Sequence, residues 1–269
     1  MSRVIKVSAT LLVLVAIAAV IGPVLSPHDY ASTNFDGILQ PPGLADLRLF
    51  GTDDLGRDQF VRTMMGVRVT LVVAVVASLV SLLIGVAYGA VAGYVGGRVD
   101  AVMMRVVDTL YALPFIFFVI LLMVAFERNF LLIFVAIGAI NWLDMARIVR
   151  GQTLSLRERE FVEAARLTGV STPRIIARHI APNLIGIVVV YITLTIPQAI
   201  LVESFLSFLG LGIQEPQTSL GSLVNVGVGQ MEGASWILLI PAGLLAMILL
   251  CFNFLGDGLR DYFDVRQSR

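Results

Sequence analysis

Charged residues are scarce in this sequence, and lysine and cysteine are almost absent. Of its 269 residues, 14% are charged and 58% are hydrophobic, whereas soluble domains have about 25% charged and about 45–50% apolar residues. This composition excludes an ordinary soluble domain and indicates an integral membrane protein. The single cysteine, Cys251, excludes an intrachain disulfide. The net charge of zero disfavours a nucleic-acid partner.

The scarcity of lysine and histidine also limits the chemistry that the chain can perform. A P-loop needs a lysine directly after a glycine-rich loop, and Lys6, the only lysine, follows no such loop. The two histidines, His28 and His179, lie far apart, and no G-x-S-x-G or H-E-x-x-H motif occurs. The sequence therefore predicts a chain that is not an enzyme and binds no cofactor or metal of its own.

Acidic side chains that could couple transport to an ion gradient are few. Secondary transporters place ionisable groups near the middle of the membrane. Here Asp108 and Asp144 lie near the ends of apolar runs, close in sequence to Arg105 and Arg147, so local ion pairing is their expected role. Glu203 lies near the end of another run and can face a cavity. An ion-coupled carrier or channel therefore stays open as an alternative.

Six runs without charged residues predict an all-α membrane protein with six transmembrane helices. About 20 apolar residues cross the roughly 30 Å hydrocarbon core of a membrane. The runs are Val7–Pro27, Val69–Gly97, Thr109–Phe126, Asn129–Leu143, Ile180–Val202 and Gly233–Gly256. The fourth run is short, so we expect its helix to continue toward Ile148. The first lacks a small-residue cleavage site before His28, which predicts an uncleaved helix instead of a signal peptide.

These runs divide the chain into three parts. Residues 1–27 are predicted to form an N-terminal transmembrane helix, 28–68 an external segment, and 69–269 a core of five transmembrane helices with a cytoplasmic loop at 150–183. This orientation places 14 basic residues in the cytoplasm and 5 outside, 19 in all, in agreement with the positive-inside rule. Both termini are then cytoplasmic. In the external segment, Gly51–Asp58 is expected to form a tight turn before a short helix.

Four glycines recur at intervals of four residues in the second apolar run. They are Gly85, Gly89, Gly93 and Gly97. On a helix, residues at this spacing share one face and let another backbone approach closely. Helix packing is therefore their expected role, with Gly97 at the end of the helix rather than in its middle.

The cytoplasmic loop carries signals for two short helices. Ser155 and Glu158 fit a capping box, which predicts a helix that begins there and runs to Thr168. Gly169 supplies the residue that commonly ends a helix. A second short helix is expected over Thr172–Pro182, with a proline at its first turn, where no hydrogen-bond donor is lost.

The first of these loop helices has a face of small residues. The i, i+3, i+4, i+7 spacing brings together Phe161, Ala164, Ala165 and Thr168. On the remaining surface, we expect Glu163 to pair with Arg159 and Arg166. A charged helix with an exposed face of small residues favours docking of a soluble protein. The alternative is a helix that lies on the lipid headgroups, which usually has a bulky apolar face.

Taken together, these motifs resemble the inner-membrane permeases of ABC importers. Glu163–Ala165, Gly169 and His179–Asn183 resemble the cytoplasmic EAA loop of that class. Segments that resemble its peptide/nickel group are Gly51–Asp58, Gly93–Gly97 and Leu206–Gly212. Segments similar to the C-subunit branch of the oligopeptide permeases are Pro114–Leu122, Trp142–Leu156 and Cys251–Asp261. Ala181 departs from the loop's pattern, which prefers leucine before Pro182.

This resemblance implies a fold and a set of partners. The fold would be the type I importer permease bundle, also called MetI-like, with a cytoplasmic coupling helix. The chain would belong to a bacterial inner-membrane importer of oligopeptides, with a homologous permease, two cytoplasmic ATPase subunits and an external, periplasmic peptide-binding protein. ATP and Mg would be bound by the ATPase subunits. Importers of dipeptides, nickel or modified peptides are alternatives within the same group.

The resemblance also implies two sets of site residues. Coupling to the ATPase would involve Phe161, Glu163, Ala164, Ala165, Thr168 and Gly169. The external gate, or the contact with the binding protein, would involve Thr52, Asp53, Arg57, Asp58, Glu203 and Ser207.

Overall fold

The computed structural model describes residues 3–44, 46–114, 117, 121 and 130–267. In these residues the secondary structure is helical, apart from an isolated β-bridge between Thr52 and Asp58. The long helices are α1 (Arg3–Leu25), α2 (Gln59–Val95), α3 (Gly97–Tyr111), α5 (Phe130–Arg157), α8 (Ala181–Phe208) and α10 (Trp236–Gln267). The shorter ones are η1 (Phe35–Gly37), α6 (Glu160–Leu167), α7 (Thr172–Ile175), the π-helix η2 (Ile176–Ile180) and α9 (Leu220–Gly229). The all-α prediction is confirmed over this part of the chain.

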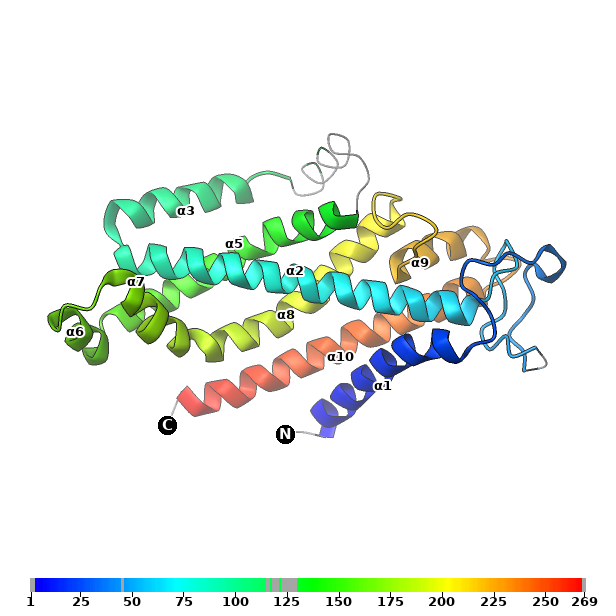
Figure 1. Cartoon of the computed structure of the whole chain (residues 1–269), viewed down its shortest axis with the longest axis horizontal. Helices are drawn as coiled ribbons and strands as arrows, with labels where there is room; N and C mark the ends of the chain where they lie inside the picture. The colour runs from blue at the N-terminus through cyan, green and yellow to red at the C-terminus, as the bar shows by residue number, and fades with distance from the viewer. Residues whose placement is uncertain (1–2, 45, 115–116, 118–120, 122–129, 268–269) are drawn as a thin grey trace.

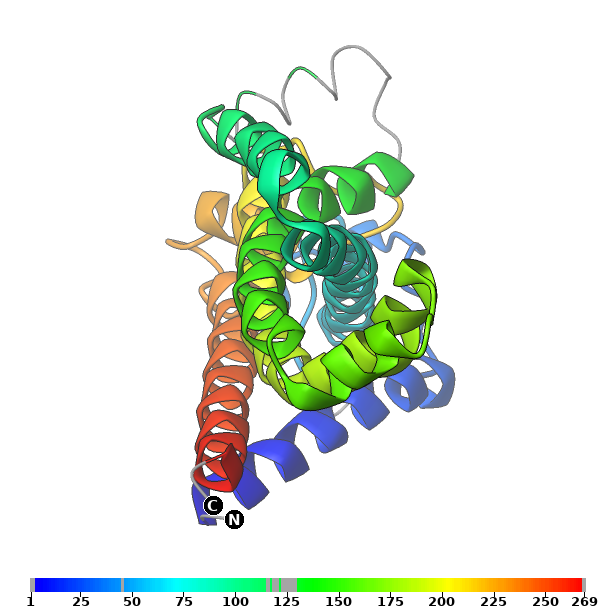
Figure 2. The ribbon, with the colours of Figure 1, turned by 90° about the vertical axis from the view of Figure 1, so that its left-hand side faces the viewer.

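The long helices lie side by side along the longest dimension of the molecule (Figure 1). The helices α6 and α7 form one end of the bundle, and α9 with the loops before α2 forms the other end. Figure 2, seen from the α6 end, shows the start of α1 close to the end of α10. The side chain of Ile5 lies against Gly258 at this point.

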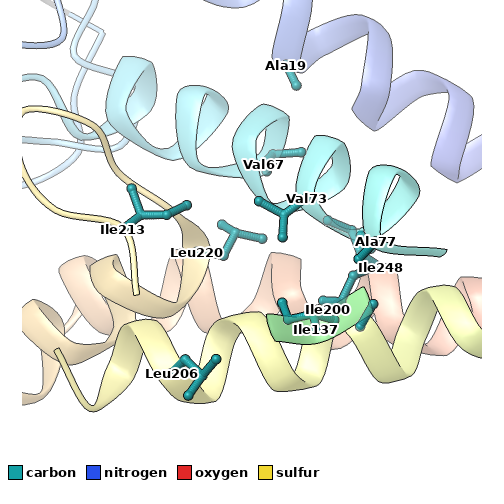
Figure 3. Close-up of a cluster of buried hydrophobic side chains, with 12 residues drawn as sticks. Ala19, Val67, Val73, Ala77, Ile137, Ile200, Leu206, Ile213, Leu220 and Ile248 are labelled. Carbon is teal, nitrogen blue, oxygen red and sulfur yellow. The ribbon is translucent and has the colours of Figure 1, made fainter. Parts of the chain in front are cut away.

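Two clusters of buried apolar side chains hold the helices together. The first joins α1, α2, α5, α8, α9 and α10, and Figure 3 shows Val73 of α2 pointing toward the side of Ile137 and Ile200. The second lies toward the α6 end and combines Tyr94 of α2 with Val162 of α6 and residues of α5, α7 and α8. Because lipid is as apolar as these side chains, close packing is what favours contact between helices in a membrane.

Three glycines of α2 allow close packing against α5. A Cβ atom added at Gly85 would overlap the side chain of Met145, and one at Gly93 would lie 2.7 Å from the carbonyl oxygen of Arg150. A Cβ at Gly89 would meet the carbonyl of Ala146. The packing role predicted for these glycines is therefore confirmed. The same Cβ test finds open space at the fourth glycine of the series, which begins α3.

Four helices of the described chain are long and apolar enough to cross a membrane. They are Arg3–Leu25, Gln59–Val95, Thr172–Phe208 and Trp236–Asp261. They cover the first, second, fifth and sixth predicted runs. From Phe130 on, the run Asn129–Leu143 lies within α5, which continues to Arg157. Most of the run Thr109–Phe126 falls outside the described residues.

Two predicted boundaries are wrong. The helix after the turn at Gly51–Asp58 is not a separate short helix, because α2 begins at Gln59 and continues to Val95. Asp58 caps it, accepting a hydrogen bond from the amide of Val61 at 2.8 Å. The transmembrane helix therefore starts within the segment that was predicted to be an external connector.

The second loop helix does not end near Pro182. The helices α7, η2 and α8 follow one another without a break, so a single rod runs from Thr172 to Phe208. Pro182 has no amide hydrogen to donate to the preceding turn. The π-helix just before it accommodates this missing hydrogen bond without ending the helix. The side chain of Asn183 also donates to the carbonyl of His179 at 2.7 Å, which satisfies one acceptor of that turn.

Candidate coupling and external sites

The coupling helix α6 begins later than its local capping signal predicts. Ser155 does not start a helix, since α5 continues through it to Arg157 and the N-cap of α6 is Arg159, without a side-chain hydrogen bond. Leu156 of α5 packs against the second apolar cluster. This packing keeps the last turn of α5 helical, so the tertiary contact prevails over the capping box at Ser155 and Glu158.

Gly169 ends α6 as the sequence predicts. Its φ is 78°, in the left-handed region that glycine adopts readily. The amide of Gly169 donates to the carbonyl of Arg166, and the amide of Val170 donates to the carbonyl of Ala165, both at 3.1 Å. These two bonds form a Schellman motif. Val170 and Ala165 also pack in the same apolar cluster, which supplies the hydrophobic contact that usually accompanies this motif.

The inner and outer faces of α6 differ from the predicted ones. Val162 and Ala165 face inward and are 0% and 7% exposed, and they pack with Tyr94, Ile175 and Ile180. The prediction that Ala165 shares an exposed docking face is therefore wrong, because its side chain lies between α6 and the rest of the bundle. The outer face presents Phe161, Glu163, Ala164, Leu167 and Thr168. Leu167, which the sequence analysis did not single out, is 83% exposed.

Arg166 connects α6 to α2. Its guanidinium lies 5.5 Å from the ring centroid of Tyr94, within the range of a cation–π contact. The predicted pairing of Glu163 with Arg159 and Arg166 is not found among the ion pairs of the described residues. Tyr94 of α2 thus links to α6 through the side chain of Arg166.

Ion pairs between helices fix α5 against α3 near the same end. Arg150 donates two hydrogen bonds to Asp100, each 2.6 Å long, and Arg147 donates to Asp108 at 2.8 Å. Asp108 therefore pairs across two helices and not with the nearby Arg105. The end of the bundle with α6 thus combines ion-paired helices with an exposed short helix.

At the opposite end, four of the predicted external residues are buried in one network. Thr52, Asp53, Arg57 and Asp58 are between 0% and 6% exposed. Asp53 accepts a hydrogen bond from Nε of Arg57 at 2.7 Å. Thr52 accepts from the amide of Gln40 at 2.8 Å and donates to the carbonyl of Gly37. This network folds the segment before α2 onto itself.

Two residues that sequence reasoning missed, Arg62 and Glu215, complete this network. Glu215 accepts from Arg57 at 2.9 Å and from Arg62 at 3.1 Å, and Arg62 also lies 3.3 Å from Asp53. Partial burial raises the pKa of the Glu215 carboxyl, but the hydrogen bonds and charges of the two arginines outweigh this effect and hold it below its usual range. No local pattern marks Glu215, because its partners lie far away in the sequence.

Glu203 and Ser207 belong to a second buried network. The Glu203 carboxylate is 0% exposed and accepts hydrogen bonds from Ser207 at 2.7 Å and from Thr70 at 3.1 Å. Thr70 in turn accepts from the amide of Leu220 at 3.2 Å. One carboxylate thereby connects α8, α2 and the first turn of α9.

This burial corrects the role predicted for the external residues. A side chain that is 0–6% exposed cannot touch another protein in this conformation, so direct contact with a binding protein through these six is wrong for the conformation described. Glu215, with its side chain 59% exposed, is the member of these two networks that reaches the surface. Several buried atoms near the start of α2 have no hydrogen-bond partner among the described residues, namely Asp58 Oδ2, Gln59 Oε1, Arg62 Nη1 and Thr63 Oγ1.

The described residues contain no cluster of three or more histidine, cysteine, aspartate or glutamate side chains that could hold a metal ion.

Two family models match this chain. A family model described as "Binding-protein-dependent transport system inner membrane component" matches residues 85–269. A second, described as "N-terminal TM domain of oligopeptide transport permease C", matches residues 2–42.

Relatives match nearly the whole chain. It is 55% identical to the oligopeptide transport system permease protein OppC of Escherichia coli K12 over 257 residues, which are 96% of this chain and 85% of that protein. It is 47% identical to the dipeptide transport system permease protein DppC of Bacillus subtilis over 260 residues, 96% of this chain and 81% of that protein.

A solved structure shares the fold. The MetNI methionine ABC transporter in an inward-facing conformation matches with a TM-score of 0.59 at 19% identity, over 74% of this chain and 94% of that one. The MetI-like fold of type I importer permeases is therefore confirmed.

Proposed function

We propose, on the premise that this chain belongs to the family of binding-protein-dependent inner-membrane permeases, that it is a permease subunit of an ATP-driven oligopeptide importer. The observation that carries this function is the 55% identity to the oligopeptide permease OppC across 96% of the chain. It is an integral protein of the inner membrane. The chain forms the translocation path together with a homologous permease.

The helix α6 is the point at which separate ATPase subunits act on this chain. Its outer face offers Phe161 and Leu167, two apolar side chains that are 40% and 83% exposed, at the end of the bundle. Its inner face belongs to the apolar cluster that also contains Tyr94 of α2 and residues of α5 and α7, and Arg166 lies over the Tyr94 ring. A displacement of α6 by an ATPase would therefore be transmitted to the bundle through this cluster. ATP and Mg are bound by those subunits, and this chain binds no cofactor.

The topology follows from the placement of the two ends. Six helices cross the membrane, with residues 1–27 as the first, 28–68 largely external, and 69–269 as the core. The end with α6 is cytoplasmic, and both termini are on that side. Figure 1 supports this arrangement, since the loops before α2 and α9 lie at the opposite end from α6.

The external end receives a peptide-binding protein and carries the gate. The two buried networks serve as its internal frame, and Glu215 is the charged group they present outward. The unpaired polar atoms near Arg62 give this frame groups that can change partners when the permease opens, because unsatisfied buried polar atoms favour any arrangement that pairs them.

The substitution Leu167→Asp tests the coupling role. An apolar anchor at the centre of an interface contributes about 2 kcal/mol or more to binding, so we expect at least a tenfold loss of ATPase recovery and of peptide uptake. The amount of inserted permease should not change, because Leu167 makes few contacts within its own chain. Co-purification of ATPase subunits and uptake of a labelled tripeptide are the measurements.

Met231→Asp is the matched control. Met231 is 58% exposed and follows α9 at the other end of the bundle, so its substitution should leave ATPase recovery unchanged. If Leu167→Asp binds the ATPases and transports as the unchanged protein does, α6 is not the coupling element.

A second cargo is supported by the 47% identity to a dipeptide permease. Importers of dipeptides, nickel and modified peptides share this family, and competition against tripeptide uptake separates them. If an excess of unlabelled dipeptide or nickel abolishes tripeptide uptake and longer peptides do not, the cargo is the dipeptide or nickel and not oligopeptides.

Two readings outside the family make different predictions. An ion-coupled carrier would show flux driven by a proton gradient when the chain is reconstituted alone. A structural scaffold would leave peptide uptake normal after deletion of the chain.

A further inference from the structure

The first helix is the least buried of the four candidate spans. Of its apolar window 17% is buried, compared with 22% in each of Thr172–Phe208 and Trp236–Asp261 and 39% in α2. Its side chains Val4, Val7 and Val24 are 51%, 58% and 81% exposed. In a membrane this surface is available to lipid or to another protein.

A groove runs between α1 and α10, which we call the α1–α10 groove. It has a volume of about 570 Å³ and is lined mainly by Arg3, Val7, Leu11, Gly243, Met247 and Phe254. This volume lies within the range of about 300–1,000 Å³ that is usual for ligand sites. Gly243 helps to open it, since a Cβ atom added there would meet nothing within 4 Å.

The groove has a charged group at one end only. Its lining is apolar apart from Arg3, Ser8 and Cys251, and it includes no acidic residue. Within the described part of the chain, the Arg3 guanidinium has no ion pair or side-chain hydrogen bond, and it is exposed. A cation at the end of an apolar channel matches an anionic head with a hydrocarbon tail.

The length of the groove separates a lipid from a protein helix. The lining spans eight rises on α1, from Arg3 to Leu11, and eleven on α10, from Gly243 to Phe254, or about 12–16 Å at 1.5 Å per residue. This is close to half of the roughly 30 Å hydrocarbon core, the depth of one leaflet. A transmembrane helix of a partner would need a groove along the full thickness of the membrane, whereas an acyl chain needs a single leaflet.

We propose that the α1–α10 groove binds an acyl chain of an anionic glycerophospholipid, with Arg3 beside its phosphate. The lipid comes from the leaflet at the Arg3 end of α1. It fills the space that α1 leaves against α10 and so joins this helix to the bundle.

Native mass spectrometry of the full-length chain, purified with its co-purifying subunits, tests this proposal. The probes are phosphatidylglycerol and phosphatidylethanolamine with identical acyl chains. We expect the unchanged protein to retain phosphatidylglycerol about three- to tenfold more strongly, in line with the attraction of one basic residue to anionic lipid. Arg3→Gln should remove this preference while both lipids still bind.

Gly243→Phe tests the groove itself. A Cβ atom at position 243 meets no neighbouring atom, so the phenylalanine side chain can extend into the groove. Phenylalanine also has a better helix propensity than glycine. We expect retention of both lipids to fall about tenfold or more. The control is Ala9→Phe, on the opposite flank of α1, where a second groove is lined by Ala9, Val72 and Phe252; it should leave the preference for phosphatidylglycerol intact.

Three results would overturn the proposal. These are equal retention of the two lipids by the unchanged protein, normal retention by Gly243→Phe, and crosslinks from a photoreactive group at position 243 to another protein chain. Because neither lipid measurement depends on ATP or peptide, failure here would leave the importer function untouched.

Discussion

The two ends of the bundle differ in the exposure of their charged residues. At the external end, Asp53, Arg57 and Arg62 have side chains only 2–7% exposed, and Asp53 pairs with both arginines. At the end formed by α6, Glu163 and Leu167 are exposed, and Glu163 forms no side-chain hydrogen bond or ion pair among the described residues. One end therefore buries its charged side chains, and the other exposes them.

Because of this difference, substitutions at the two ends should have different effects. Breaking a buried charged network leaves a charge without compensation, which destabilises the chain itself. Changing an exposed helix alters what binds to it and leaves the folded chain almost unaffected. Substitutions at the two ends should therefore separate stability from coupling.

Asp53→Ala is expected to have the largest effect on stability. It would leave Arg57 and Arg62 close together with Glu215 as their remaining partner, and removing one member of a buried ion pair costs about 3–5 kcal/mol. Thermal unfolding of the detergent-solubilised protein measures this loss. Asp54→Ala is the control, since Asp54 makes no side-chain hydrogen bond or ion pair among the described residues. Equal melting temperatures for both variants would show that the network is dispensable.

Local sequence signals predicted the features that depend on one residue's geometry. Gly169 ends α6 because it adopts a positive φ, and the glycines of α2 pack against α5 because they have no side chain. Both properties belong to the residue type and need no knowledge of the fold. Four of the six charge-free runs correspond to helices long and apolar enough to cross a membrane, since span length follows from membrane thickness.

Features that depend on distant contacts could not be predicted. Arg57 and Glu215 meet across more than half of the chain, and nothing near either residue marks the other. The inner face of α6 was also mistaken, because small size suggested a docking face for Ala165. A better signal was present: Ala165 and Val170 occupy the two positions of a Schellman motif that normally hold a hydrophobic contact.

Gly169→Val should have a smaller effect, confined to the end of the bundle with α6. The left-handed conformation costs a branched residue about 1–2 kcal/mol, and since no atom lies within 4 Å of the added Cβ, no clash adds to it. We expect the end of α6 to fray, seen as faster hydrogen exchange at residues 165–170, and ATPase recovery to fall while the melting temperature stays nearly unchanged.

Gly169→Asn sharpens this test, because asparagine adopts positive φ more readily than valine. It should retain most of the ATPase recovery. If asparagine and valine reduce recovery equally, the backbone conformation at this position is not what matters for coupling.

Glu215→Gln is expected to have the smallest effect, and one that depends on pH. Burial raises the pKa of Glu215, but Arg57 and Arg62 outweigh it and hold the pKa below its usual range. The ion pairs therefore stabilise the folded chain above the ordinary glutamate pKa of about 4.3, and this contribution is lost as the pH falls through the lower, folded-state pKa. Because the side chain is 59% exposed, solvent screening limits the contribution to about 1 kcal/mol or less.

Melting temperatures of the unchanged protein and of Glu215→Gln, measured at neutral pH and near pH 3, isolate this contribution from that of other acids. The unchanged protein should be the more stable at neutral pH, and the two should converge in acid. A difference that persists in acid would mean that Glu215 acts through its shape rather than its charge. The buried pair of Arg57 and Arg62 with Asp53 would then supply the electrostatic stabilisation of this end without Glu215.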